Sequence, residues 1–115
     1  MTQFISSNVT VMISNMDKSI AFYTQTLGLK LKNRYGDHWA EVEGPGIIIG
    51  LHPSSKINTG DNLSIAFSVK DIDKAVAELE KKGITFNIYK DDKNNLAFFK
   101  DPDGNTLYLA PAQWG

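Results

Sequence analysis

Two kinds of hydrophobic spacing follow one another along the chain. Residues 4–13 are rich in β-branched and apolar side chains, which alternate with other residues as on a strand with one buried face. From Asn15 to Gly28 the apolar positions recur at helical spacing instead, with Asn15 suited to be the N-cap and Gly28 to end the helix. Residues 29–35 and the stretch 38–51 then show strand patterns again. The first half of the chain therefore predicts the element order βαβββ.

The second half shows the same order of patterns. A strand is expected over residues 63–69, where apolar and small polar side chains alternate. Asp71 is placed to cap a helix, and Gly83 is placed to end it. A further strand is expected over 84–89, followed by a polar turn and a closing hairpin over 95–111. These elements make a second βαβββ module.

The two modules agree in spacing as well as in order. Gly104–Pro111 repeats the pattern of Gly46–Pro53 at an offset of 58 residues, and Asp71 follows Asn15 at an offset of 56. Each half is too small to bury one face of its helix alone, so two halves are expected to complete each other. The predicted fold class is α+β. Two βαβββ modules joined edge to edge would form one curved mixed sheet, with the helices on its outer face and a concave pocket on the other.

The centre of the closing hairpin has the composition of a tight turn. In Asp101–Gly104 the proline presets one backbone angle, the aspartate can bond its own backbone, and the glycine accepts the angle that closes the turn. Strands rich in Phe, Leu and Tyr flank it on both sides. The hairpin is therefore fixed by local chemistry.

Length and composition narrow the possible classes of protein. The 115 residues suit one domain, with modules at about 4–53 and 63–111 and a polar linker at about 54–62. The net charge of −1 comes without a basic stripe, which argues against a nucleic-acid partner. There are no cysteines, so disulfides and thiol chemistry are excluded. No apolar run is long enough to span a membrane and the N-terminus does not resemble a signal peptide, so a cytoplasmic protein is expected.

Three stretches carry a resemblance to a known family. Residues 9–29, 65–84 and 99–109 resemble the glyoxalase / bleomycin resistance / extradiol dioxygenase superfamily, also called the vicinal oxygen chelate proteins. The resemblance covers essentially the whole chain and implies the paired βαβββ fold. It does not imply one reaction, because the superfamily includes lyases, epimerases, dioxygenases, thiol transferases and non-catalytic drug binders linked to antibiotic resistance.

The resemblance also implies where a metal would be held. Members that use a metal place histidine and glutamate at fixed positions facing the concavity, and these positions correspond here to Asn8, Gly50, Ser64 and Tyr108. None of the four is a histidine or a carboxylate, whereas a divalent ion needs several good donors that converge. The sequence thus predicts no metal site of the family type and no cofactor.

Other arrangements of the same residue types stay open. The two histidines, His38 and His52, lie in the first hairpin near Glu41 and Glu43, so a displaced His/His/Glu metal set is conceivable. Glu41 and His52 are also the candidates for catalytic acid–base chemistry. His52 is two residues from Gly50 and is expected to share its face of the sheet.

What remains is a pocket without a metal. The candidate ligand-binding residues are those on the expected concave side: Asn8, Trp39, Gly50, His52, Ser64 and Tyr108. The facing of Trp39 is open, because the neighbouring Gly-Pro-Gly turn could contain a bulge; an inward ring would form a stacking wall for a planar ligand.

The favoured interpretation is a metal-independent binding protein that sequesters an aromatic or amphipathic drug or metabolite. The alternative is a lyase, an epimerase or a ring-cleaving dioxygenase-like enzyme with a displaced or absent metal. A third class is an interaction protein with a filled concavity. A small-molecule ligand and a second copy of the chain are the expected partners, since pairing would cover exposed sheet edges.

Overall fold

The computed structural model describes residues 3, 5–57, 63–90 and 95–112, and the chain divides into two compact units, 1–58 and 59–115. Each unit contains one of the expected βαβββ modules, here called the first and the second module. The first module consists of β1 (Val9–Ile13), α1 (Met16–Ala21), a π-helical turn η1 (Phe22–Thr26), β2 (Lys30–Tyr35), β3 (Trp39–Gly44) and β4 (Ile47–Pro53). The second consists of β5 (Ile65–Val69), α2 (Ile72–Glu80), β6 (Asn87–Lys90), β7 (Asn95–Lys100) and β8 (Thr106–Pro111).

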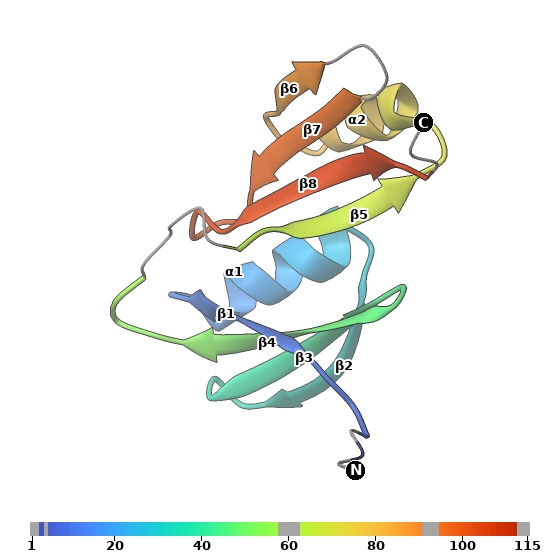
Figure 1. Ribbon diagram of the computed structural model, residues 1–115. Helices are drawn as coiled ribbons and strands as arrows, with labels where there is room; N and C mark the ends of the chain where they lie inside the picture. Colours follow the sequence, from blue (N-terminus) through green and yellow to red (C-terminus); the bar gives the residue numbers. More distant parts are fainter. Residues whose placement is uncertain (1–2, 4, 58–62, 91–94, 113–115) are drawn as a thin grey trace. The chain divides into compact units, whose positions relative to one another are not determined.

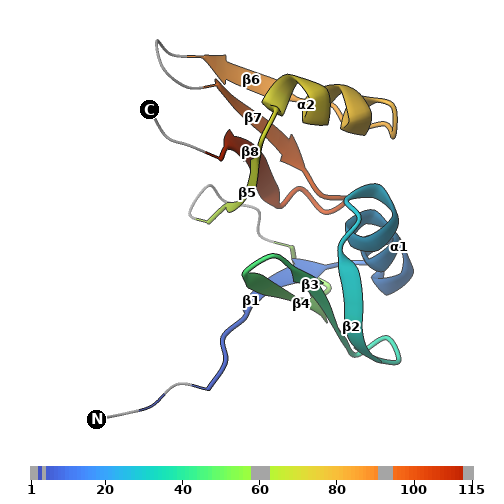
Figure 2. The same ribbon diagram turned by 90° about the vertical axis from the view of Figure 1, so that its right-hand side faces the viewer.

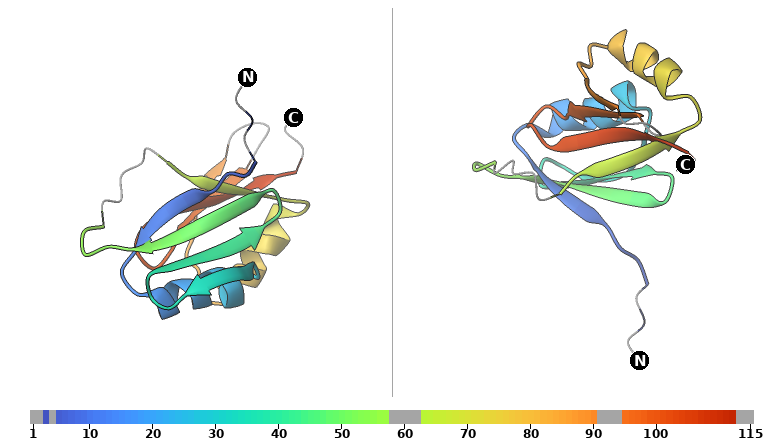
Figure 3. Two further views of the ribbon diagram at one scale, coloured as in Figure 1. Left: turned by 90° about the horizontal axis from the view of Figure 1, so that it is seen from below. Right: turned by 45° about the horizontal axis from the view of Figure 1, so that its top comes forward.

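The repeat seen in the sequence is a repeat of sheet topology. The first sheet has the strand order β1-β4-β3-β2 and the second has the order β5-β8-β7-β6 (Figure 1 and, for the first sheet, the left view of Figure 3). In each sheet the opening strand pairs in parallel with the closing strand, and the other pairs are antiparallel. The paired βαβββ modules are confirmed. The strands form two four-stranded sheets, one in each module, where one curved sheet was expected.

Each helix covers one face of its own sheet. α1 contacts β3 and β4, and α2 contacts β7 and β8; Figure 2 shows α2 on one side of the second sheet. Buried side chains lie between α1 and its sheet, where those named below are fully buried, and on the face that the second sheet turns toward α2, where those named are at most 7% exposed. This set comprises Ile13, Tyr23, Val42, Ile49 and Leu51 in the first module and Ile65, Ala97, Phe99, Leu107 and Leu109 in the second. The opposite face of each sheet does not pack against the helix of its own module and is therefore the candidate face for a functional site.

The predicted caps start both helices. The side chain of Asn15 accepts a hydrogen bond from the backbone N–H of Lys18 at 3.0 Å, and Asp71 accepts one from Lys74 at 3.1 Å. Each bond satisfies one of the N–H groups that the first turn of a helix leaves without a partner. The stop glycine that follows each helix has a positive φ, as predicted.

We expect Asn15→Ala to lower the free energy of unfolding by about 1 kcal/mol, because one backbone N–H of α1 loses its partner. Urea unfolding followed by circular dichroism measures the change. Asn15→Asp is the control, since its carboxylate can accept the same bond and should retain the stability of the native chain. Equal losses in both variants would contradict the capping role.

The end of the first helix differs from the prediction of a regular helix up to Gly28. After Ala21 the chain makes a π-helical turn, and Leu27 donates its backbone N–H to the carbonyl of Phe22 at 3.0 Å. Tyr23, in this turn, is fully buried, so the wider turn places a large side chain in the core. Such single turns interrupt regular helices in other proteins as well.

Some strand boundaries and the position of one irregularity also differ from the sequence prediction. β1 begins at Val9, so residues 5–8 precede the strand, and β6 covers Asn87–Lys90 where 84–89 was expected. The irregularity suspected near the Gly-Pro-Gly turn lies instead in β2, between Leu31 and Asn33. Parts of the expected linker and of the polar turn after β6, residues 58–62 and 91–94, lie outside the described residues.

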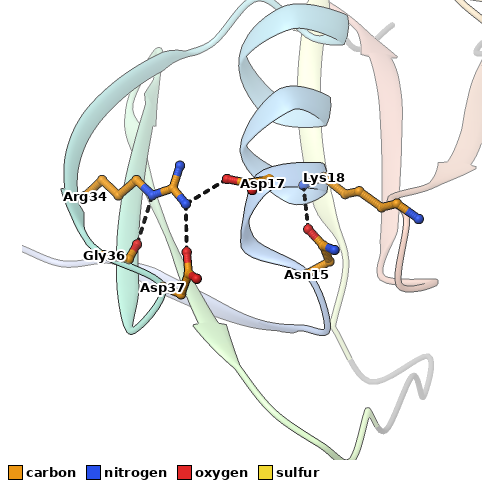
Figure 4. Close-up of polar contacts among 6 residues, drawn as sticks. All are labelled: Asn15, Asp17, Lys18, Arg34, Gly36 and Asp37. Atoms are coloured by element: carbon orange, nitrogen blue, oxygen red, sulfur yellow. Dashed lines mark hydrogen bonds and ion pairs between the residues drawn. The ribbon is translucent and has the colours of Figure 1, made fainter.

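An arginine joins α1 to the outer strand of the first sheet. Arg34 of β2 donates from Nη2 to Asp17 in α1 and to Asp37 in the following turn, both at 2.8 Å, and from Nε to the carbonyl of Gly36 at 2.9 Å (Figure 4). The hydrogen bonds to Asp17 and Asp37 raise the pKa of Arg34 above its ordinary value. This cluster lies on the helix side of the sheet, so it positions α1 and leaves the opposite face free.

Candidate functional site

The first sheet turns a polar and aromatic face away from α1. The pairing of β1, β3 and β4 places Thr10 and Glu41 beside Gly50, and Met12 beside His52. Since alternate residues of a strand point to opposite faces, these residues lie opposite the buried side chains that face the helix. The expectation that His52 shares the face of Gly50 is confirmed.

Trp39 lies across Gly50 on this face. A Cβ added at Gly50 would be 2.2 Å from Cη2 and 2.7 Å from Cζ2 of Trp39, and 3.1 Å from Oγ1 of Thr10. The six-membered ring of the indole therefore occupies the space where any other residue at position 50 would carry its side chain. The imidazole of His52 meets the indole edge to face, with ring centroids 6.3 Å apart. The facing of Trp39, left open by the sequence, is thus toward the side away from α1.

Polar side chains border this aromatic surface. Asn8, just before β1, donates from Nδ2 to Oγ1 of Thr10 at 3.0 Å. On the neighbouring strands Asn33 donates from Nδ2 to the carboxylate of Glu41 at 2.8 Å. Glu41 and His52 share the face, but within the described residues no hydrogen bond or ion pair joins them. This face thus has polar groups that could orient a ligand, and the carboxylate of Glu41 already accepts a hydrogen bond from the side-chain amide of Asn33.

The second sheet repeats this layout with different side chains. Tyr108 of β8 pairs with Ala66 of β5 on one side and with Phe98 of β7 on the other. The rings of Phe98 and Tyr108 are stacked, with centroids 4.9 Å apart and an interplanar angle of 29°. Phe99, the next residue, points the other way into the core. Tyr108 is therefore part of an aromatic pair on the face away from α2.

A cavity of about 300 Å³ opens at one end of this second face. It is lined by apolar, hydroxyl and amide side chains and by one lysine: Leu63, Ser64, Thr85, Asn87, Phe98, Phe99, Lys100 and Thr106. It includes Ser64, one of the residues expected from the sequence. Lys100 was not among them, although its alternation with Phe98 along β7 places it on the same face.

The six expected ligand-binding residues fall into two groups, one in each module. The first module brings together Asn8, Trp39, Gly50 and His52, and the second carries Ser64 and Tyr108. A single pocket that uses both groups remains a prediction. Within the described residues, no cluster of three or more His, Cys, Asp or Glu side chains is arranged to hold a metal ion.

The comparison with known families covers nearly all of both modules. The family model described as "Glyoxalase/Bleomycin resistance protein/Dioxygenase superfamily" matches residues 6–109. The chain belongs to this superfamily. The resemblance that the sequence suggested is therefore confirmed, and the paired βαβββ modules are the superfamily's fold.

Two similar proteins are enzymes of different kinds, and a third is an uncharacterized protein. An uncharacterized protein of Mycolicibacterium smegmatis is 32% identical over 101 residues, which cover 86% of both chains. The glutathione transferase FosA of Serratia marcescens is 30% identical over an alignment that covers 90% of this chain and 77% of its own. The lactoylglutathione lyase of Schizosaccharomyces pombe is 25% identical, and this chain spans about half of its length, 48%.

Solved structures of similar proteins have the same fold. A glyoxalase family protein from Enterococcus faecalis gives a TM-score of 0.77 at 23% identity, covering 90% of this chain and 94% of its own. TnmS3, an antibiotic binding protein from a Streptomyces species, gives a TM-score of 0.71 at 25% identity and covers 96% and 100% of the two chains. Among the described residues, no helix has the length and apolar character needed to cross a membrane.

Proposed function

We propose that this superfamily member is a metal-independent protein that binds and sequesters an aromatic or amphipathic small molecule. Stacking and apolar burial on the aromatic faces would supply affinity, while a few polar groups orient the ligand. We further propose that it acts in the cytoplasm and as a homodimer, in which pairing covers sheet edges.

The observation that carries the proposal is the position of Trp39. In superfamily members that use a metal, the position equivalent to Gly50 holds a ligand side chain. Here the indole ring occupies the space of that side chain, since a Cβ would lie 2.2 Å from Cη2. An aromatic ring thus stands where a metal ligand would stand, which favours stacking over coordination.

Donor chemistry and one relative support the same proposal. The other three equivalent positions carry Asn8, Ser64 and Tyr108, whose neutral oxygens are weak ligands for a divalent ion. TnmS3 is an antibiotic binding protein with the same fold at 25% identity. A binding function is therefore compatible with this scaffold.

The proposal is tested by metal and ligand titration of the purified chain in a Trp114→Phe background, where Trp39 is the remaining tryptophan. We expect less than stoichiometric metal by mass spectrometry and no saturable change of Trp39 fluorescence with Ni²⁺ or Zn²⁺. A panel of planar aromatic compounds should instead give saturable quenching. Calorimetry should find binding at least about tenfold weaker in Trp39→Ala, since a stacked aromatic contact is lost with its buried area.

Tyr89→Ala, which removes an exposed tyrosine of β6 in the other module, is the matched control and should bind like the native chain. Stoichiometric metal that is lost in His52→Ala would overturn the proposal and favour the enzyme alternative with a displaced metal. Absence of binding across the aromatic panel would overturn it as well.

A further inference from the structure

The cavity of the second module has the chemistry of a site for a small organic anion. Among the described residues, its lining has one ammonium group, three hydroxyl groups and one amide, and no carboxylate. Its volume of about 300 Å³ is at the lower end of the range for small-molecule sites. We propose that this cavity binds the carboxylate of a small aromatic acid, with Lys100 as the anion-binding residue. This inference rests on the proposed binding function and goes beyond the stacking surface at Trp39, because the cavity lies in the second module.

Lys100 is positioned by the hairpin of β7 and β8. It pairs with Thr106 across the two strands, and its Nζ donates a hydrogen bond to Oγ1 of Thr106. An ammonium group has three N–H donors, so this bond fixes the group and leaves donors for a ligand. Lys100 forms no ion pair with a carboxylate of the described residues. Its charge is therefore available to an incoming anion.

The carboxylate that is closest along the chain is engaged elsewhere. Asp101 follows Lys100 directly, but it is only 4% exposed. Its two oxygens accept hydrogen bonds from Asp103 and Asn105 within the turn. Asp101 thus belongs to the turn and not to the cavity lining, and the cavity keeps the positive charge of Lys100.

The rest of the lining suits the other parts of an aromatic acid. Phe98, two residues before Lys100 on the same face, stacks on Tyr108 and offers an apolar ring to the ligand. Ser64 and Asn87 add a hydroxyl and an amide that can donate to a second carboxylate oxygen. A ring on Phe98 and a carboxylate on Lys100 would satisfy both parts of the cavity at once.

The test compares 2-naphthoate with 2-naphthamide, which have the same ring system but differ in charge. Titrations of the isotope-labelled full chain are followed by amide NMR shifts. We expect 2-naphthoate to shift the amides of β7 and β8 and to bind about tenfold more tightly than 2-naphthamide, as a charge-assisted hydrogen bond would give. Lys100→Met should remove this preference. Lys74→Met, which removes an exposed lysine of α2, should keep it.

The outcomes separate this inference from the proposed function. Equal affinity for the two compounds, or a preference that survives in Lys100→Met, would overturn the anion site and leave aromatic binding intact. Carboxylate binding whose shifts avoid β7 and β8 would also overturn it. Failure of both compounds to bind would overturn it too, and the aromatic panel then decides separately whether the proposed function stands.

Discussion

Replacing Asp101 with alanine is expected to lower the free energy of unfolding of the second module by about 3 kcal/mol. The carboxylate is buried, and its Oδ1 accepts from the backbone N–H of Asp103 at 3.0 Å and of Asn105 at 2.8 Å. Its Oδ2 accepts from Nδ2 of Asn105 at 2.9 Å. Hydrogen bonds to a charged group contribute about 1.5–3 kcal/mol each, and partial access of water to the half-buried donors reduces the sum.

A graded series separates these bonds. Asn105→Ala removes the side-chain bond to Asp101 and should cost about 1 kcal/mol, while Asp101→Asn retains one oxygen for the two backbone donors and should fall between the two variants. Urea unfolding and hydrogen exchange of the β7 and β8 amides give the values. If Asp101→Ala unfolds within about 0.5 kcal/mol of the native chain, the carboxylate does not organise the hairpin.

The sequence anticipated this turn because its chemistry is local. A proline, an aspartate and a glycine at fixed positions specify the backbone at Asp101–Gly104 without reference to distant residues, and Gly104 has the positive φ expected of it. The same reason explains why the N-caps at Asn15 and Asp71 were identified correctly. Repetition of these local signals in two halves then made the βαβββ order readable.

Features that depend on strand register or on long side chains could not be predicted from local sequence signals. The direction of Trp39 follows from the pairing of β3 with β4, which is regular, whereas the sequence allowed a bulge there. The π-helical turn at Phe22–Thr26, which contains the buried Tyr23, has no local signal in the sequence. The sequence does not single out Lys100, because a single lysine on a strand is typical of a solvent-exposed position.

In the candidate site, too, the positions of residues could be predicted from the sequence but their contacts could not. The repeat assigns Gly50 and Tyr108 to corresponding positions, and the structure pairs them with Thr10 and Ala66 in the same way in the two sheets. The contacts that give these positions a chemical character, the indole across Gly50 and the ring of Phe98 on Tyr108, required the strand pairing. The sequence pattern therefore predicts where these residues lie, but their chemical surroundings depend on contacts between strands.

Gly50→Ala is expected to displace the indole of Trp39 and to weaken binding of aromatic ligands at least about tenfold. The new Cβ would lie 2.2 Å and 2.7 Å from two ring atoms of Trp39, much closer than van der Waals contact allows, so the ring must move. The cost of overpacking should lower the free energy of unfolding by about 1–3 kcal/mol. In the Trp114→Phe background, near-ultraviolet circular dichroism and fluorescence report the displacement of Trp39 directly.

A double-mutant cycle with Trp39→Phe identifies the cause. The phenyl ring lacks the part of the indole that reaches Gly50, since Cη2 and Cζ2 belong to the six-membered ring of tryptophan. In the Trp39→Phe background, Gly50→Ala should therefore cost much less than in the native chain, and the coupling energy should be at least about 1 kcal/mol. Additive costs would mean that the loss comes from Thr10, whose Oγ1 lies 3.1 Å from the new Cβ, or from the strand itself. Coupling would instead show that glycine at position 50 is needed to seat the indole, which links this residue directly to the proposed stacking surface.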